Sequence, residues 1–297
     1  MLIDDLIDFC DSRRKNMLAV GGSKCTRCDM PAHWCNKNCG TCLNQIHFTR
    51  KPGERTDYDC ENMIDFYVCS YTHKYASEFL YMLTHFNAVK NLEEYRIISI
   101  GCGGCSDLIA FDKFAHDIRK NFYYVGIERN PSWHYVHGFL CSKINTEHSS
   151  STLRFIYGDA INIISRNIDN ITANNFNILV MNYVLSSVYY SGYDKAVAFC
   201  NDIMNILLKN PQLPKPFIVL INDINTPDVT QLIDNFSQQI IKFYGSSANI
   251  ARDSFPYDKT NKCGPYQLLF SLPAFLDTDH YRIRQYCTSS VMAAEIG

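Results

Sequence analysis

One short stretch of the chain joins a run typical of a buried strand to a glycine-rich turn and the start of a helix, and it constrains the fold more than any other feature. The stretch runs from Ile97 to Leu108 and reads IISIGCGGCSDL. A side chain at Gly101 or Gly103 would collide with a ligand or forbid the dihedral angles of the turn, and the helix that follows offers free N–H groups. The arrangement predicts that the backbone closely approaches a small polar ligand such as a nucleoside.

Later runs of the same buried-strand type each end at polar residues. These pairs of run and polar end are Phe122–Ile127 with Glu128, Leu153–Tyr157 with Gly158 and Asp159, Phe176–Met181 with Asn182 and Tyr183, and Phe217–Ile221 with Asn222 and Asp223. An acidic residue at the position of Glu128 can accept both hydroxyls of a ribose. Because open parallel sheets bind ligands at the carboxyl ends of their strands, these polar groups are expected to share one site.

With these residues, the chain from about 95 to 272 resembles a class I S-adenosylmethionine-dependent methyltransferase. The resemblance implies an α/β fold with a seven-stranded, mostly parallel sheet sandwiched by helices. It also implies S-adenosylmethionine as cofactor and methyl transfer as the reaction. The acceptor is not determined, and small molecules, proteins and RNA all stay open.

The cofactor contacts that we assign from this resemblance are Ser99, Gly101, Gly103, Cys105, Glu128, Asp159, Asn182 and Tyr183. The resemblance implies that Gly101 and Gly103 face the methionine portion and that Glu128 holds the ribose. It places Asp159 at the adenine and Asn182 near the transferred methyl group. Asp159 is equally typical of the residue that caps a helix beginning at position 160.

Two positions depart from the family pattern. The acidic residue often found two positions before the first glycine is Ser99, and the third small residue of the turn is Cys105. A dinucleotide-binding Rossmann domain is the nearest competitor, since it opens with the same order of strand, glycine turn, helix, strand and acid. Its G-x-G-x-x-G fingerprint needs glycine or alanine where this chain has Ser106, which favours the methyltransferase interpretation.

A cluster of five cysteines within eighteen residues is the second informative feature. Its members, which we predict to bind metal, are Cys25, Cys28, Cys35, Cys39 and Cys42. The two C-x-x-C pairs in this cluster can hold a tetrahedral zinc ion through four thiolates. A change of ligands or a second ion stays open, with His33, His47, Cys60 and Cys69 as further ligands.

The last three cysteines of the cluster also have the C-x3-C-x2-C spacing with which radical S-adenosylmethionine enzymes hold a [4Fe–4S] cluster. An iron–sulfur cluster is therefore the alternative to zinc, because thiolate sites accept either metal. Thr41 stands where that family usually has an aromatic residue, and the later strands do not predict a barrel.

The chain is expected to divide into two parts. Residues 1–94 are predicted to form an N-terminal helical lobe with a metal-binding loop at about 23–50, and residues 95–297 a methyltransferase-like domain with a C-terminal tail. The expected elements outside the first five strands are helices at 1–20, 60–86 and 228–241, and a final antiparallel pair of strands at 240–244 and 267–272. Tyr71 and Tyr75, one helical turn apart, either face the cofactor or are core aromatics, and we favour the core.

Composition is typical of an intracellular enzyme. The 297 residues are 46% hydrophobic and 20% charged with a net charge of −2, and the acidic opening of the chain is not a secretion signal. We therefore expect a cytoplasmic protein that does not bind a membrane. Nine lysines and arginines against two acidic residues between Arg13 and Arg55 leave contact with RNA open. The alternative function is a non-catalytic binding or scaffold protein that uses the zinc lobe as its contact surface.

Overall fold

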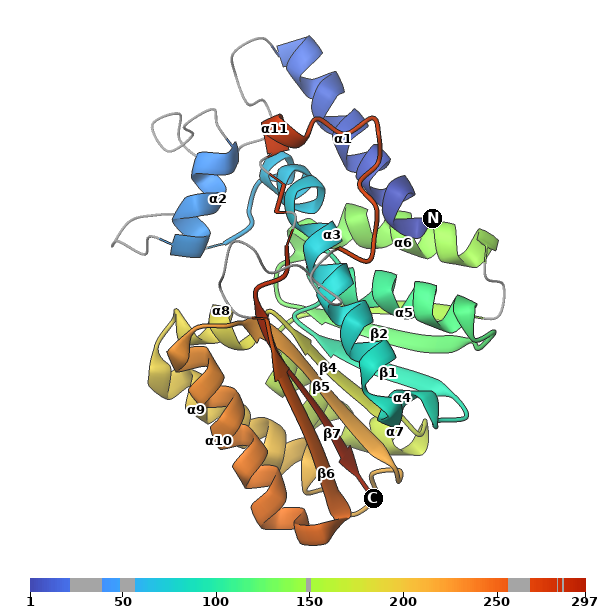
Figure 1. Cartoon of the computed structure of the whole chain (residues 1–297), viewed down its shortest axis with the longest axis vertical. Coiled ribbons are helices and arrows are strands. Elements are labelled where there is room, and N and C mark those ends of the chain that lie inside the picture. Colours follow the sequence, from blue (N-terminus) through green and yellow to red (C-terminus); the bar gives the residue numbers. More distant parts are fainter. Residues whose placement is uncertain (22–38, 49–56, 148–150, 256–267, 282, 285) are drawn as a thin grey trace.

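The computed structural model describes residues 1–297 except 22–38, 49–56, 148–150, 256–267, 282 and 285. Its centre is a seven-stranded sheet in the order β3-β2-β1-β4-β5-β7-β6 (Figure 1). The strands are β1 (Tyr95–Ile100), β2 (Phe122–Glu128), β3 (Thr152–Tyr157), β4 (Ile178–Asn182), β5 (Phe217–Ile224), β6 (Ala248–Ser254) and β7 (Ser289–Ile296). Within this sheet, β7 alone runs antiparallel to both of its neighbours. The seven mostly parallel strands confirm the predicted fold class.

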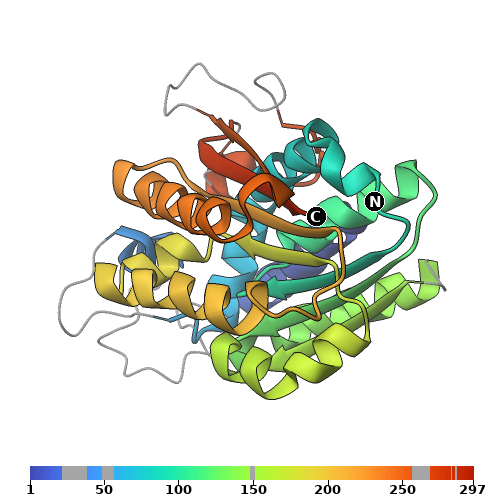
Figure 2. The same cartoon turned by 90° about the horizontal axis from the view of Figure 1, so that it is seen from below.

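Helices cover both faces of the sheet, and each face has its own hydrophobic cluster. Figure 2 shows α10, α9 and α7 on one side of the sheet and α3 and α5 on the other. The first face carries α1 (Leu2–Gly21), α3 (Glu61–His85), α5 (Ser106–Asp117) and α6 (His134–Glu147). The second carries α7 (Ala160–Ala173), α8 (Leu185–Tyr189), α9 (Tyr193–Asp202), a π-helical segment η2 (Ile203–Leu208) and α10 (Pro227–Tyr244). The shorter helices are α2 (Cys39–Phe48), α4 (Asn87–Lys90), α11 (Thr278–Tyr281), η1 (Pro131–Trp133) and η3 (Gly245–Ser247).

The strands of the sheet are apolar on both sides because both sides are covered. Consecutive residues of β1, Ile97 and Ile98, are fully buried but belong to different hydrophobic clusters. Successive side chains of a strand point to opposite faces, so a strand between two helical layers needs a continuous apolar run rather than an alternating one. This requirement explains why the strand runs are so clear in the sequence.

Helix α3 connects the N-terminal part of the chain to the sheet. It spans Glu61–His85, close to the predicted 60–86, and most of its residues are buried. Its core residues share one hydrophobic cluster with α1, α5 and β1. In Figure 1, α3 runs along the face of the sheet from the end at which the parallel strands finish. The first half of α3 therefore lies where the sheet's ligand site is expected.

The end of the chain differs from the prediction. Residues 240–244, expected to be a strand, are the last turn of α10, which ends where Gly245 adopts a φ of +58°. The antiparallel pair consists instead of β6 and β7, and the C-terminal tail supplies β7. The predicted second strand, 267–272, contains no strand among its described residues. The apolar run at the end of α10 was misread because a short apolar run is compatible with a strand as well as with the buried face of a helix.

Among the described residues, no helix has both the length and the apolar character needed to cross a membrane.

Candidate functional site

A cavity of about 710 Å³ lies at the carboxyl ends of the parallel strands. Six of the eight predicted cofactor-binding residues line it, namely Gly101, Gly103, Glu128, Asp159, Asn182 and Tyr183. They come from the turns after β1, β2, β3 and β4, which meet at one edge because these strands are parallel and adjacent. The remaining wall is provided mainly by α3, η1 and the segment around α8.

The glycine turn after β1 uses backbone conformations that other residues rarely adopt. Gly101 has a φ of +61° and Gly103 a φ of +42°. The Gly101 N–H donates a hydrogen bond to the carbonyl of Ile127 (2.7 Å), which ties the turn to β2. A Cβ atom on Gly101 would lie 3.0 Å from Cγ2 of Val184, so a side chain is excluded by strain as well as by contact. The turn keeps backbone rather than side chain at this wall of the cavity.

Glu128 is held rigidly at the end of β2. Its Oε2 accepts a hydrogen bond from the Gly103 N–H (2.9 Å), and its Oε1 accepts one from the Asn130 N–H (2.9 Å). The residue is 9% exposed, and burial raises the pKa of its carboxyl although these two backbone hydrogen bonds favour the charged form. Each carboxylate oxygen can accept more than one hydrogen bond. Glu128 therefore offers unused acceptor capacity to a hydroxyl group in the cavity.

Asp159 follows β3 and has a structural role in addition to its place at the cavity. It is the N-cap residue of α7, and its Oδ1 accepts a hydrogen bond from the Asn162 N–H (2.9 Å). It is exposed and lines the same cavity as Glu128. The helix-capping interpretation is thus confirmed, while the second carboxylate oxygen has no part in the cap.

Asn182 and Tyr183 occupy the end of β4 in a strained and well-bonded position. Asn182 donates to Ser106 Oγ (2.9 Å) and accepts from Asn222 Nδ2 (2.8 Å). Tyr183 has a φ of +59°, unusual for a residue with a large side chain. Such strain persists only where the surroundings impose it, and it concentrates at functional sites.

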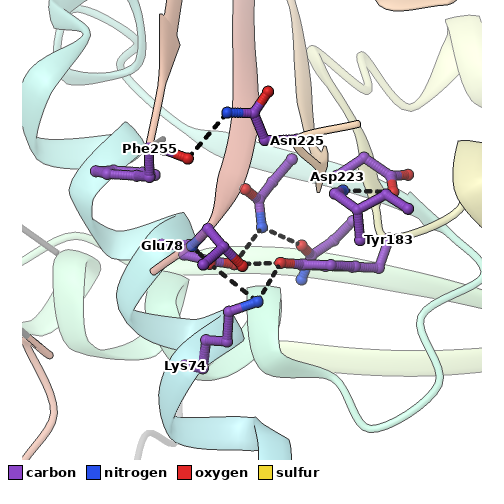
Figure 3. A network of polar contacts seen from close by, with 10 residues as sticks. Lys74, Glu78, Tyr183, Asp223, Asn225 and Phe255 are labelled. Carbon is purple, nitrogen blue, oxygen red and sulfur yellow. Dashed lines mark hydrogen bonds and ion pairs between the residues drawn. The ribbon is translucent and has the colours of Figure 1, made fainter. Parts of the chain in front are cut away.

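A buried polar network fixes the Tyr183 side chain (Figure 3). Its hydroxyl donates to Glu78 Oε2 (2.7 Å) and accepts from Lys74 Nζ (3.0 Å). Lys74 and Glu78 also form an ion pair of 3.4 Å, with side chains 8% and 0% exposed. Burial is the main cause that raises the pKa of Tyr183, and the charge of Glu78 adds to it. The phenol is therefore neutral at physiological pH and oriented from two sides.

Aromatic rings form one wall of the cavity. Tyr67, Tyr71 and Tyr75 follow one another on a single face of α3. The Tyr71 and Tyr75 rings are stacked with centroids 5.5 Å apart, and the Tyr75 ring lies 3.8 Å from that of Tyr183. Trp133 contacts Tyr67 edge-to-face at 5.6 Å. The faces of such rings attract cations, so the wall suits a positively charged ligand group.

Two predicted cofactor contacts do not line the cavity. Ser99 and Cys105 are fully buried behind it. Cys105 adopts a left-handed conformation with a φ of 55° and is the N-cap residue of α5. Both are placed where they support the turn rather than face the cavity.

The predicted metal-binding cluster lies largely outside the described residues. Cys25, Cys28 and Cys35 are not described, nor is His33. Cys39 and Cys42 lie in the first turn of α2, where Arg14 Nη1 donates to the Cys39 sulfur (3.0 Å) and Cys42 is buried. Zinc and iron–sulfur binding by this cluster stay predictions.

Several cavity residues were missed by sequence reasoning. Lys74, Glu78, Tyr67 and Trp133 carry no recognisable motif, and two of them are charged residues inside a helix. The only available signal was the four-residue spacing of Tyr67, Tyr71 and Tyr75, which places three tyrosines on one helical face. The expectation that Tyr71 and Tyr75 are core aromatics was too simple, because both line the cavity.

No family model matches the chain, and no curated protein matches it. Solved structures with a related overall shape include the plantazolicin methyltransferase BpumL in complex with SAH, which is 10% identical, with 97% of this chain and 99% of that chain covered and a TM-score of 0.45. Another is a class I S-adenosylmethionine-dependent methyltransferase from Listeria monocytogenes, 7% identical, with 100% and 88% covered and a TM-score of 0.46. A third is a cyclopropane-fatty-acyl-phospholipid synthase-like protein from Lactobacillus casei, 10% identical, with 81% and 94% covered and a TM-score of 0.42. At these identities and TM-scores the likeness assigns no function, which must be argued from the site residues.

Proposed function

We propose that this protein is an S-adenosylmethionine-dependent methyltransferase. The observation that carries the proposal is the meeting, around one cavity, of a side-chain-free turn, the fixed carboxylate of Glu128 and an aromatic wall. The residues fit the cofactor by the chemistry of each group. Glu128 would accept the ribose hydroxyls, Asp159 would accept the exocyclic amine of adenine, and the glycine turn would lie against the methionine portion.

The aromatic wall would act on the reactive part of the cofactor. A sulfonium is a cation, and the faces of tyrosine rings stabilise cations electrostatically. The cofactor supplies an activated methyl group, and the protein must align an acceptor with that group and exclude water. The stacked Tyr75 and Tyr183 rings, held by Lys74 and Glu78, supply a rigid and largely dry surface for this alignment. Asn182 is the polar side chain that we assign to the neighbourhood of the transferred methyl.

The methyl acceptor belongs to one of three classes: a small molecule, a protein or RNA. The basic segment between Arg13 and Arg55 is the feature that supports RNA. The cysteine-rich segment, with Cys25, Cys28, Cys35, Cys39 and Cys42, is proposed to bind zinc and to shape or cover the acceptor site. A scaffold protein without catalysis is the second candidate function, supported by Ser99 and Cys105 at positions where the family has other residues.

Calorimetric titration with S-adenosylmethionine and its demethylated product tests the proposal. We expect both to bind the wild-type protein and Glu128→Gln to weaken binding by at least about tenfold, since charged hydrogen bonds contribute roughly 1.5–3 kcal/mol each. Glu93→Gln, at an exposed glutamate away from the cavity, is the matched control and should bind like the wild type.

Two results separate the parts of the proposal. Absence of binding by folded wild-type protein, verified by circular dichroism, rejects the cofactor assignment and favours the scaffold function. Binding by the wild type with an unchanged affinity in Glu128→Gln rejects only the ribose assignment.

A further inference from the structure

A second group of chemically reactive side chains lies directly behind the glycine turn. We call Cys102, Cys105 and His137 the turn cluster. Their sulfur and ring nitrogen atoms all lie within 4.8 Å of one another, and the side chains are 6%, 0% and 1% exposed. None of them belongs to the cysteine-rich segment at 25–42. Two thiols and an imidazole gathered in a buried pocket need an explanation that packing alone does not supply.

Local backbone structure brings the two thiols together. Cys102 and Cys105 form a C-x-x-C sequence, and the Cys105 N–H donates to the Cys102 carbonyl (2.6 Å), which closes a tight turn. Cys105 is held at a φ of 55°, which is strained for a residue other than glycine. Tight C-x-x-C turns place both sulfurs on one side, as structural zinc sites require.

His137 is positioned on the turn from α6. Its ring stacks on Phe155 with centroids 4.1 Å apart and an interplanar angle of 9°, and Nδ1 lies 2.8 Å from the Tyr157 hydroxyl. Nε2 then faces the turn, 3.9 Å from the Cys102 sulfur and 2.8 Å from the Gly103 carbonyl oxygen. A hydroxyl partner on the second ring nitrogen is the arrangement that orients metal-binding histidines. The Tyr157 hydroxyl can donate or accept, so it supports the tautomer that leaves Nε2 free to bind a metal.

We propose that the turn cluster is a zinc site in which the Cys102 and Cys105 sulfurs and His137 Nε2 are the three protein ligands. Cys102 lines the cavity, so the fourth position of a tetrahedral ion faces the cavity and can take water. Binding releases the two thiol protons to solvent, and a divalent ion with two thiolates and a neutral imidazole has no net charge. Such a group is therefore compatible with complete burial.

Distances and proton affinities agree with this assignment. Zinc bonds of about 2.3 Å to sulfur and about 2.0 Å to nitrogen bring tetrahedral ligand atoms to roughly 3.5 Å from each other. The observed 3.9 Å between the Cys102 sulfur and His137 Nε2 needs only a small approach. Burial opposes ionisation of the Cys105 thiol, but a hydrogen bond from Cys102 and the charge of His137 outweigh it and lower the pKa of Cys105. A thiol that ionises readily is a ready metal ligand.

Metal binding tests the proposal on the full chain. Protein treated with a chelator is titrated with Co²⁺, and bound zinc is counted separately by elemental analysis after dialysis against zinc chloride. We expect His137→Gln and Cys105→Ser each to bind one ion fewer than the wild type, with the corresponding loss of cobalt–thiolate absorption. Cys200→Ser, at a buried cysteine on α9 outside the cluster, controls for the loss of a core thiol and should bind as many ions as the wild type. Unchanged stoichiometry in folded His137→Gln and Cys105→Ser overturns the proposal.

A second measurement needs no variant and distinguishes this site from the cysteine-rich segment. Cysteines of the wild-type protein are alkylated with and without zinc, and the rate at each cysteine is followed by mass spectrometry of its peptide. We expect zinc to slow alkylation of Cys102 and Cys105 by at least about tenfold, whatever happens at residues 25–42. Rates at these two cysteines that agree within twofold with and without zinc overturn the proposal.

Discussion

Glu78 is the residue whose replacement most directly tests how the cavity wall is held together. Its carboxylate is completely buried on α3 and accepts hydrogen bonds from the Thr288 N–H (2.9 Å), the Tyr183 hydroxyl (2.7 Å) and Asn222 Nδ2 (3.4 Å). It also pairs with Lys74 at 3.4 Å. These partners come from β4, β5 and the segment before β7, so one side chain joins α3 to three parts of the sheet (Figure 3). We predict that Glu78→Gln strongly lowers the free energy of unfolding.

The size of the effect follows from the buried charge that is left behind. At 3.4 Å, the attraction between Lys74 and Glu78 is about 5 kcal/mol for an effective dielectric constant of about 20. Removal of one member of a buried pair costs about 3–5 kcal/mol, because the other charge stays buried without compensation. Glutamine keeps the shape and one acceptor oxygen but places an amide donor against the donors that surround it. We therefore expect a loss of about 3 kcal/mol.

Urea unfolding followed by tryptophan fluorescence measures this loss, provided that the dependence on urea concentration is unchanged. Lys74→Met in the Glu78→Gln background removes the uncompensated cation, so the double variant should lose less than the sum of the two single variants by at least about 1 kcal/mol. Glu94→Gln, which breaks an exposed ion pair with Arg96, is the matched control and should cost less than about 1 kcal/mol. Additive losses, or a loss below about 0.5 kcal/mol for Glu78→Gln, would refute the reasoning.

Three further predictions concern the turn, a helix cap and a buried acid. Gly101→Ala should destabilise the protein by about 1–3 kcal/mol in thermal or urea unfolding and weaken cofactor binding in calorimetry, because its φ of +61° and the 3.0 Å approach to Val184 are both unfavourable; a stable variant with full affinity would contradict this. Asp159→Ala should cost about 1 kcal/mol of unfolding free energy by removing the cap hydrogen bond to Asn162, and Asp159→Ser should restore most of it; equal losses in both would show that the cap is unimportant. Burial raises the pKa of Asp223 to about 6, above the roughly 3.9 of an exposed aspartate, so its protonated form stabilises the fold at low pH and this contribution of about 3 kcal/mol is lost as pH rises from about 4 through 6. Unfolding measured across that range should therefore fall less steeply in Asp223→Asn than in the wild type, and parallel curves would reject the assignment.

Much of the sheet could be predicted because its strands leave local signals. Each parallel strand is covered on both faces, so its sequence is a continuous apolar run that ends at a glycine or a polar residue. The end of the sheet was mispredicted because β7, SSVMAAEI, begins with two serines that are nonetheless fully buried. Its place between β5 and β6 is set by pairing with strands far away in the chain. Nothing in the local sequence encodes that pairing.

The candidate site divides in the same way. Gly101, Gly103 and Glu128 could be identified because a turn and a strand end each require particular residues over a few positions. Lys74, Glu78 and Tyr67 could not, since a charged or aromatic residue inside a helix is usually solvated or in the core. The C-x-x-C of Cys102 and Cys105 was present in the sequence, but His137 joins it only through the packing of α6 against the turn.

The sequence by itself determined the order of strands and helices, the backbone of the glycine turn and the acidic residues at two strand ends, because these depend on interactions between residues close in the chain. Only the tertiary structure decided which helix forms the cavity wall, which buried charges neutralise each other and which thiols lie beside an imidazole. These arrangements depend on contacts across 30 to more than 200 positions, such as the hydrogen bonds of Cys102 to His137 and of Glu78 to Thr288. A polar side chain acquires its chemical role from the partners that burial forces upon it, and those partners are chosen by the fold.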